Sequence, residues 1–239
     1  MGDGIYCALS GALSQQTALD ATATNLANAS TAGYRTETPI FREVLRQAGP
    51  MGTLRFAEVQ ATAMSSDPGA LRSTGRDLDV ALPDKVFLAV QTDGGERYTR
   101  AGSLQVRPDG TLSTKDGRPV LSDKDAPIKL PPGAAPLISS SGEISTKDGP
   151  VGRLKLVSFA EPAWLVHEGS TLLASTNDSG QATAAAAEIT VGALEDSNAS
   201  PVAAMTQLLS ASRMFDAFQR AIETFHESDR RVATTTPGT

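Results

Sequence analysis

The last stretch of the chain, from Ser200 to about Val232, carries a heptad pattern that a helix packing only on its own core does not need. Apolar residues recur there at alternating steps of four and three: Ala204, Leu208, Ala211, Phe215, Phe218, Ile222 and Phe225. This spacing is typical of a coiled-coil seam. Ser200 suits the N-cap and Pro201 the first helical position, where no N–H is needed. The pattern predicts a long C-terminal helix that needs a partner helix.

A matching pattern lies at the other end of the chain. Ile5, Leu9, Ala12, Leu19, Ala23 and Leu26 follow the same spacing, and Gln16 occupies the one missed position. A polar residue in such a seam fixes register. The alternative is a plain amphipathic helix on its own core, because its many alanines suit either structure. We expect the two helices to pair through an assembly seam. Its larger members are Ile5, Leu9, Leu19, Leu26, Leu208, Phe215, Phe218, Ile222 and Phe225.

The middle of the chain has a different character. Residues from Asn28 to Gly33 favour caps, turns and left-handed backbone, so the first helix should end near Asn28. From about residue 71 to 173, four Asp-Gly pairs separate short apolar runs, which is typical of tight hairpins. The expected fold is therefore α+β, with long coiled-coil terminal helices flanking an antiparallel all-β domain.

The pattern also predicts the boundaries of these parts. We expect an N-terminal helix with its exit turn over 1–35, an extended connector over 36–70 with one short strand at 54–59, a β-rich domain over 71–190, and a C-terminal turn and helix over 191–239.

Charge and composition exclude several classes of partner. The net charge is −6 without a Lys/Arg cluster, which argues against nucleic acid and against an anionic membrane surface. Cys7 is the only cysteine, so no internal disulfide can form. No apolar run reaches the ~20 residues of a membrane span, and the N-terminus lacks the basic flank of a secretory signal. We expect protein partners, no direct membrane insertion, and another route if the protein is exported.

Residues for catalysis or metal binding do not gather in the sequence. His167 and His226 have no cysteine or carboxylate at ligand spacing. Asp77 and Asp79 resemble a carboxylate pair for glycoside hydrolysis, but acids beside an arginine at a loop end are usually turn residues. We therefore expect no catalytic residue, no cofactor and no metal, and predict that the protein is not an enzyme.

Two segments carry a resemblance to a known family. The run Asn-Leu-Ala-Asn-Ala-Ser-Thr-Ala-Gly-Tyr-Arg over 25–35 resembles the N-terminal signature of the bacterial flagellar rod and hook proteins. Leu-Glu-Asp-Ser-Asn over 194–198, followed by Pro201 and Met205, is similar to their C-terminal signature. The signature positions are Asn25, Leu26, Asn28, Gly33, Tyr34, Leu194, Glu195, Ser197 and Asn198.

The middle of the chain also resembles this family. Segments 78–82, 98–102 and 109–112 are similar to those that open its β domain, and the segment 150–157 most resembles the proximal-rod members. Distal-rod members are near neighbours. One departure is the turn over 83–86, Pro-Asp-Lys-Val, where the family usually has a glycine.

The resemblance implies a function. Rod subunits pair their terminal helices and pack with their neighbours into a tubular shaft, so the chain is expected to be a proximal-rod subunit in the periplasm that transmits motor torque. Its implied partners are copies of itself, other flagellar rod proteins and the flagellar type III export apparatus, which needs no cleaved signal peptide. Alternatives are a distal-rod or hook-type subunit, a β-rich binding module on a helical homodimer stalk, and a hydrolase.

Overall fold

The computed structural model describes residues 2–47 and 53–235, which divide into two compact units. The helical unit contains residues up to Leu26, the segment 37–62, and the chain from Ser200 onward. The β unit contains the segments 27–36 and 63–199. The β unit thus adds the short segment 27–36, which follows α1, to its main segment 63–199.

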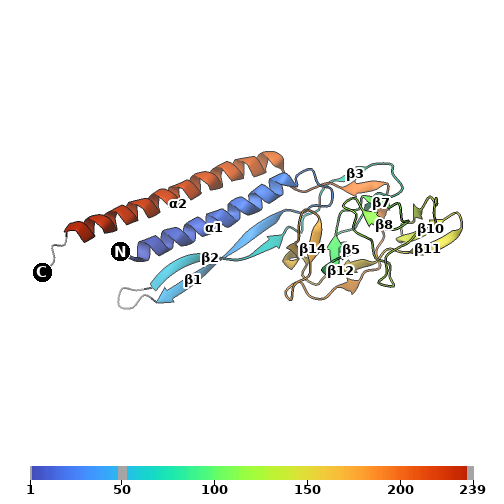
Figure 1. Cartoon of the computed structure of the whole chain (residues 1–239), viewed down its shortest axis with the longest axis horizontal. Coiled ribbons are helices and arrows are strands. Elements are labelled where there is room, and N and C mark those ends of the chain that lie inside the picture. The colour runs from blue at the N-terminus through green and yellow to red at the C-terminus, as the bar shows by residue number, and fades with distance from the viewer. Residues whose placement is uncertain (1, 48–52, 236–239) are drawn as a thin grey trace. The chain divides into compact units, whose positions relative to one another are not determined.

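The helical unit consists of two long helices and a two-stranded sheet. Helix α1 spans Gly2–Ala27 and helix α2 spans Pro201–Thr235. Figure 1 shows them side by side and running in opposite directions. Strands β1 (Glu37–Gln47) and β2 (Thr53–Met64) pair with each other. All but the last two residues of β2 belong to this unit.

The β unit is built from short strands that pair antiparallel. Its main sheet has six strands in the order β13-β14-β6-β5-β12-β15. Their bounds are β13 Val166–His167, β14 Leu172–Ala174, β6 Gly95–Thr99, β5 Val86–Thr92, β12 Leu156–Ser158 and β15 Thr183–Ala184. A 3-10 helix, Pro162–Trp164, precedes β13.

Smaller sheets complete the β unit. Strands β11 (Gly149–Arg153), β10 (Glu143–Thr146) and β9 (Leu137–Ile138) form a three-stranded sheet. Three further pairs are β16 (Thr190–Val191) with β4 (Val80–Ala81), β17 (Ala193–Glu195) with β3 (Leu71–Ser73), and β7 (Leu104–Val106) with β8 (Leu112–Thr114).

Strand β5 divides the core of the β unit into two layers. Successive side chains of a strand point to opposite faces of its sheet. Accordingly, Val86, Leu88 and Val90 lie in one apolar cluster, whereas Phe87 and Ala89 lie in another. Both faces are buried, which explains why this strand is a continuous apolar run instead of an alternating one.

The α+β class expected from the sequence is confirmed, and so are several local features. Helix α1 ends at Ala27, next to the predicted end. Ser200 caps α2, because its Oγ accepts a hydrogen bond from the Ala203 N–H at 3.4 Å. The segment interpreted as an extended connector instead forms the paired strands β1 and β2, although residues 48–52 lie outside the described part. Their apolar residues are too sparse to indicate two long strands.

Candidate functional site

One face of α2 is less exposed than the rest of the helix. Ala204 is buried, and Leu208, Ala211, Phe215, Phe218 and Ile222 are half-buried, while most of the other described side chains of α2 are exposed. These residues follow the predicted steps of four and three. Phe225, the last member of the predicted seam, is 40% exposed and departs from the pattern near the end of the helix.

Small residues form the part of α1 that meets α2. A Cβ atom built on Gly11 would lie 2.4 Å from the ring of Phe218, so the aromatic ring occupies the space that a side chain would need. Ala8 and Ala12, one turn apart on α1, are buried. Small side chains allow two helices to approach closely, and the large residues of this contact therefore come from α2.

Leu9 does not lie on this contact face. It was expected in the seam, but its side chain is 45% exposed, and Gln16 and Ala23 of the same heptad column are also exposed. Ile5, Leu19 and Leu26 are half-buried. The steps of four and three in α1 fit two neighbouring stripes. One holds the small buried residues Ala8 and Ala12, the other holds the exposed Leu9, and the sequence pattern alone does not separate them.

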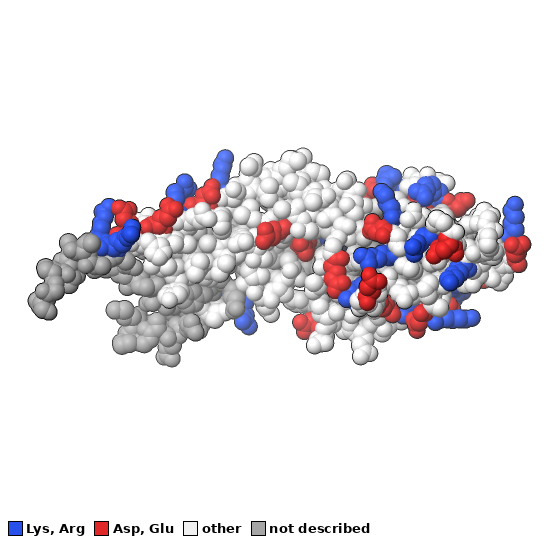
Figure 2. Space-filling view, viewed as in Figure 1, with Lys and Arg blue, Asp and Glu red and all other residues white. Residues whose placement is uncertain are grey.

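The surface of the helical unit is poor in charge over much of its length. Figure 2 shows a largely white surface along both helices, with charged atoms gathered toward the C-terminal half of α2. Exposed apolar side chains occur on both helices: Tyr6, Leu9 and Leu13 on α1, and Val202, Met205, Leu209 and Met214 on α2. Apolar exposure of this extent is typical of a protein–protein contact surface.

Asn25 closes the exit from α1 within the helical unit. Its side-chain amide donates to the Glu37 carbonyl at 2.8 Å, and its Oδ1 accepts from the Glu37 N–H at 2.9 Å. The same side chain therefore satisfies both backbone groups at the start of β1. An amide side chain has a donor and an acceptor side by side and can therefore bond both groups at once, which suits asparagine at this position.

The exit turn continues into the β unit. Asn28 is buried, and its carbonyl and Oδ1 accept hydrogen bonds from the N–H and the hydroxyl of Thr31. Gly33 has a φ of +75°, and a Cβ there would lie 2.4 Å from the backbone of Ala101. Both the backbone angle and the close approach require glycine. The Gly33 N–H donates to the Glu195 carbonyl at 2.7 Å, which joins the two family signatures.

Glu195 lies buried between two arginines, and we call Arg35, Arg100 and Glu195 the signature node. The Nε of Arg35 donates to one carboxylate oxygen at 3.2 Å, and the Nε of Arg100 donates to the other at 2.9 Å. All three residues are at most 3% exposed. The Gly69 N–H also donates to the carboxylate. The carboxylate is thus shared among three segments of the chain.

Each arginine of the node also donates hydrogen bonds to other nearby oxygen atoms. Arg35 donates to the Ser66 carbonyl at 2.8 Å and to Asp84 at 3.1 Å. Arg100 donates to the carbonyl oxygens of Leu82, Pro83 and Val86. Burial lowers the pKa of Arg100, and the charge of Glu195 opposes this shift. The glycine-free turn over 83–86 therefore supplies both carbonyl groups and a carboxylate to the node.

The remaining signature residues hold the same region together. Asn198 Oδ1 accepts from the Thr36 N–H at 2.8 Å, and its amide donates to the Asp67 carbonyl at 2.9 Å. Ser197 Oγ accepts from the Ala199 N–H at 3.1 Å, and Leu194 is buried in β17. The N- and C-terminal signatures are thus a set of mutually bonded residues at the edge of the β unit.

The rings of Tyr34, which precedes Arg35 of the node, and His167 contact each other in a tilted arrangement. Tyr34 is 1% exposed, and the ring centroids of the two residues are 5.1 Å apart. Burial lowers the pKa of His167. Neither ring nitrogen has a hydrogen-bond partner among the described residues. Burial of the ring therefore disfavours its protonated form.

Among the described residues, no group of three or more His, Cys, Asp or Glu side chains has an arrangement that could hold a metal ion. Over its described length, neither helix combines the span and apolarity that crossing a bilayer requires. His167 belongs to the β unit and His226 to the helical unit.

Comparison with known proteins covers most of the chain. The flagella basal body rod protein family matches residues 5–35, the flagellar hook protein FlgE/F/G D1 domain matches 84–146, and the C-terminal family of the flagellar basal body rod FlgEFG proteins matches 190–235. The flagellar basal-body rod protein FlgF of Salmonella typhimurium is 35% identical, and the alignment covers 97% of each chain. This chain belongs to the flagellar basal-body rod protein family.

Other relatives support the same assignment. The FlgF protein of Caulobacter vibrioides is 32% identical over 96% of each chain, and the FlgG protein of Bacillus subtilis is 31% identical over 93% of this chain and 95% of the relative. The rod protein described here is thus FlgF-like, a structural subunit of the flagellar basal body that associates with other rod proteins.

The signature residues were predicted from the sequence, but the two arginines that bond Glu195 were not. Arg35 closes the N-terminal signature and Arg100 lies in the segment 98–102 that resembles the family, yet neither was singled out. The available signal was the presence of an arginine in each of these two segments and of two acidic residues, Glu195 and Asp196, in the C-terminal signature.

The node predicts that two neighbouring carboxylates, Glu195 and Asp196, contribute very different amounts to the stability of the β unit. Glu195→Gln should lower the free energy of unfolding of the β unit by ~3–5 kcal/mol, because it leaves two buried guanidinium groups without their charge partner. Asp196→Asn removes only the exposed pair with Arg72, which is worth ~0–1 kcal/mol. Urea titrations of both variants measure the difference, and equal losses would contradict the role of the node.

His167 predicts an acid-sensitive component of stability. Its folded-state pKa is lowered, so the unfolded chain binds the proton first, and the unfolding free energy should fall as the pH drops below about 6.5. His167→Phe should flatten this dependence by up to ~1.4 kcal/mol per pH unit. His226→Phe, on the exposed surface of α2, is the control. Urea midpoints at several pH values test it, and an unchanged slope in the His167 variant would count against a lowered pKa for this imidazole.

Proposed function

We propose that this chain is a subunit of the proximal rod, and that α1 and α2 pair as a coiled coil which packs with neighbouring subunits into a torque-transmitting shaft. The observation that carries this is the helix pair itself. Phe218 fills the space above Gly11, the less exposed face of α2 follows a heptad, and both helices still expose apolar side chains. The pair therefore has one satisfied apolar face and further apolar surface for neighbours.

Heptad spacing suits a shaft for a mechanical reason. Knobs-into-holes packing spreads a load over many small contacts along the helices, so that no single bond carries the torque. Burying a leucine or phenylalanine side chain contributes ~1.5–3 kcal/mol, and several such residues must exceed the entropy lost when both helices become ordered. Packing against neighbours adds to this sum, so folding of the helices and assembly of the rod support each other.

The proximal position is favoured by the relatives. FlgF proteins from Escherichia coli, Salmonella typhimurium and Caulobacter vibrioides are 32–35% identical over nearly the full chain, whereas the FlgG protein of Bacillus subtilis is 31% identical. The distal-rod or hook-type alternative fits less well. The proposal further places the chain in the periplasmic part of the rod, delivered by the flagellar type III export apparatus without a cleaved signal peptide, and gives it no catalytic role.

A β-rich binding module on a homodimer stalk remains the second candidate. The exposed leucines and methionines of α1 and α2 would then pair in one closed dimer. A dimer has a fixed size, whereas a shaft subunit assembles in a partner-dependent way. Incorporation into basal bodies therefore separates the two functions.

The test places the same charge at two adjacent positions of α2. Phe218→Asp puts a carboxylate against α1, at a cost of several kcal/mol, and should abolish rod assembly and motility in cells that lack their own copy. Gln219→Asp introduces the same charge on the exposed side of the helix and should leave both intact.

Two measurements decide the result. Basal bodies purified from each strain show whether the variant is incorporated, and urea unfolding of the purified chains shows whether the β unit keeps its stability. Normal rods with Phe218→Asp would remove the helix pair from the account of assembly.

A further inference from the structure

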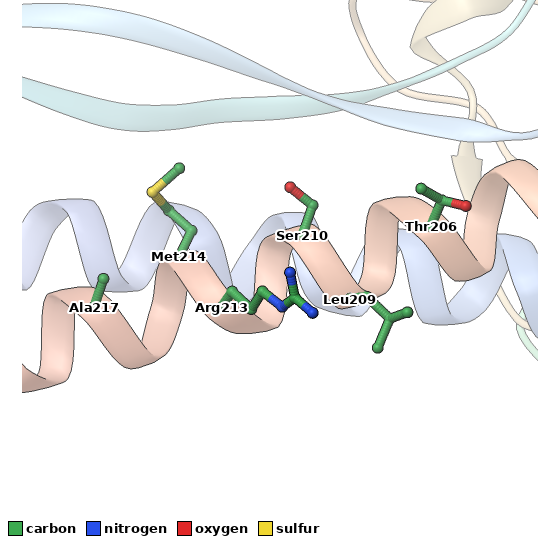
Figure 3. A pocket seen from close by; sticks show the side chains of 6 residues that line it. All are labelled: Thr206, Leu209, Ser210, Arg213, Met214 and Ala217. Atoms are coloured by element: carbon green, nitrogen blue, oxygen red, sulfur yellow. The ribbon is translucent and has the colours of Figure 1, made fainter.

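A shallow groove runs along the outer surface of α2. It has a volume of about 440 Å³ and is lined only by residues of this helix. Figure 3 shows their side chains along more than two helical turns: Thr206, Leu209, Ser210, Arg213, Met214 and Ala217. Leu209 and Met214 are 62% and 49% exposed, so the described part of the chain does not fill the groove.

The six residues have the arrangement that receives another helix. In knobs-into-holes packing, a hole is made by four residues at i, i+3, i+4 and i+7. Positions 206, 209, 210 and 213 make one such hole, and positions 210, 213, 214 and 217 make the next. The two holes are four residues apart, about 6 Å along the helix. A helix that fills both must present two apolar side chains four residues apart.

Helix α1 presents such a pair on its exposed side. Leu9 and Leu13 are four residues apart and are 45% and 57% exposed. They belong to a stripe that continues through Gln16 to Asp20, and all of these side chains are exposed. The α1 helix of the same chain cannot supply them, because it meets α2 through Gly11 and the ring of Phe218.

We propose that Leu13 and Leu9 of α1 in a second copy of this chain fill the two holes on α2. This rests on the proposed function, since copies that repeat along a shaft keep one direction, and α1 of one copy then runs opposite to α2 of its neighbour. In that direction Leu13 enters the hole at 206–213 and Leu9 enters the hole at 210–217.

The charges at the ends of the two surfaces agree with this register. Asp20 lies seven residues beyond Leu13, which places it beside the first turn of the neighbour's α2. That turn contains no acidic residue, and a helix N-terminus favours a negative charge. Asp20 has no ion pair with any described residue of its own chain, so its carboxylate is available for this contact.

The two surfaces differ from each other, so the contact is heterologous. Such a contact leaves a free stripe on one copy and a free groove on the other, and it generates rings or open helical arrays instead of closed dimers. The groove therefore specifies how copies follow one another, which the pairing of α1 with α2 inside one chain does not.

Cysteine cross-linking in assembled basal bodies tests the proposal with a matched control. Cells express two forms of the full chain, both with Cys7→Ala, one with Leu13→Cys and the other with Ser210→Cys. We expect purified basal bodies to contain a disulfide-linked species of twice the chain mass. A thiol reductant should convert this species back to the single chain. Ser212→Cys replaces an exposed serine about 160° around the helix from Ser210 and should give no such species.

A second pair keeps the test independent of any one substitution. Leu9→Cys combined with Met214→Cys probes the other hole and should also cross-link. Equal cross-linking at positions 210 and 212, or normal rods without cross-links from either pair, would overturn the groove contact and leave the proposed function standing. The unchanged chain and the chain with Cys7→Ala alone are also tested for entry into basal bodies. If both fail to enter, the proposed function is overturned instead.

Discussion

A carboxylate buried between two guanidinium groups joins the two segments of chain that make up the β unit of this rod protein. Removing charged groups from water costs several kcal/mol each, and the cost is offset only when every partner is in place. Arg35 comes from the segment 27–36, whereas Arg100 and Glu195 come from the middle and the C-terminal end of the segment 63–199. The β unit therefore reaches its charge balance only when the segment 27–36 and the C-terminal end of the segment 63–199 have both docked. We infer that the two family signatures act as one structural device.

Further hydrogen bonds join the same two stretches of the β unit. The Gly33 N–H and the Asn198 side chain each join the segment 27–36 to the C-terminal end of the segment 63–199, through Glu195 and Thr36 respectively. The chain passes from the β unit into the helical unit after residue 36 and after residue 199. These hydrogen bonds therefore hold both stretches within the β unit up to the points where the chain leaves it.

The sequence was most informative where one local pattern decides the structure. The heptads predicted both helices, and the four Asp-Gly pairs predicted short antiparallel strands, since both patterns act over a few residues. Strands β1 and β2 were not predicted, because long strands with few apolar residues have no local sequence pattern that identifies them. Leu9 was assigned to the wrong face because α1 carries two adjacent stripes, and only the position of Phe218 against Gly11 shows which one faces α2. Arg35 and Arg100 were missed because Glu195 is 160 and 95 residues away from them in the sequence.

Amide hydrogen exchange of the dilute purified chain tests the central claim, that the node holds the segment 27–36 and the C-terminal end of the segment 63–199 in the fold of the β unit. The amide of Gly33, bonded to the Glu195 carbonyl, and the amide of Asp196, bonded to the Ala70 carbonyl, should exchange as slowly as those of β5 and respond together with them to urea. Rapid exchange at both amides, while β5 and β6 stay protected, would show that these two stretches open on their own and would contradict the account.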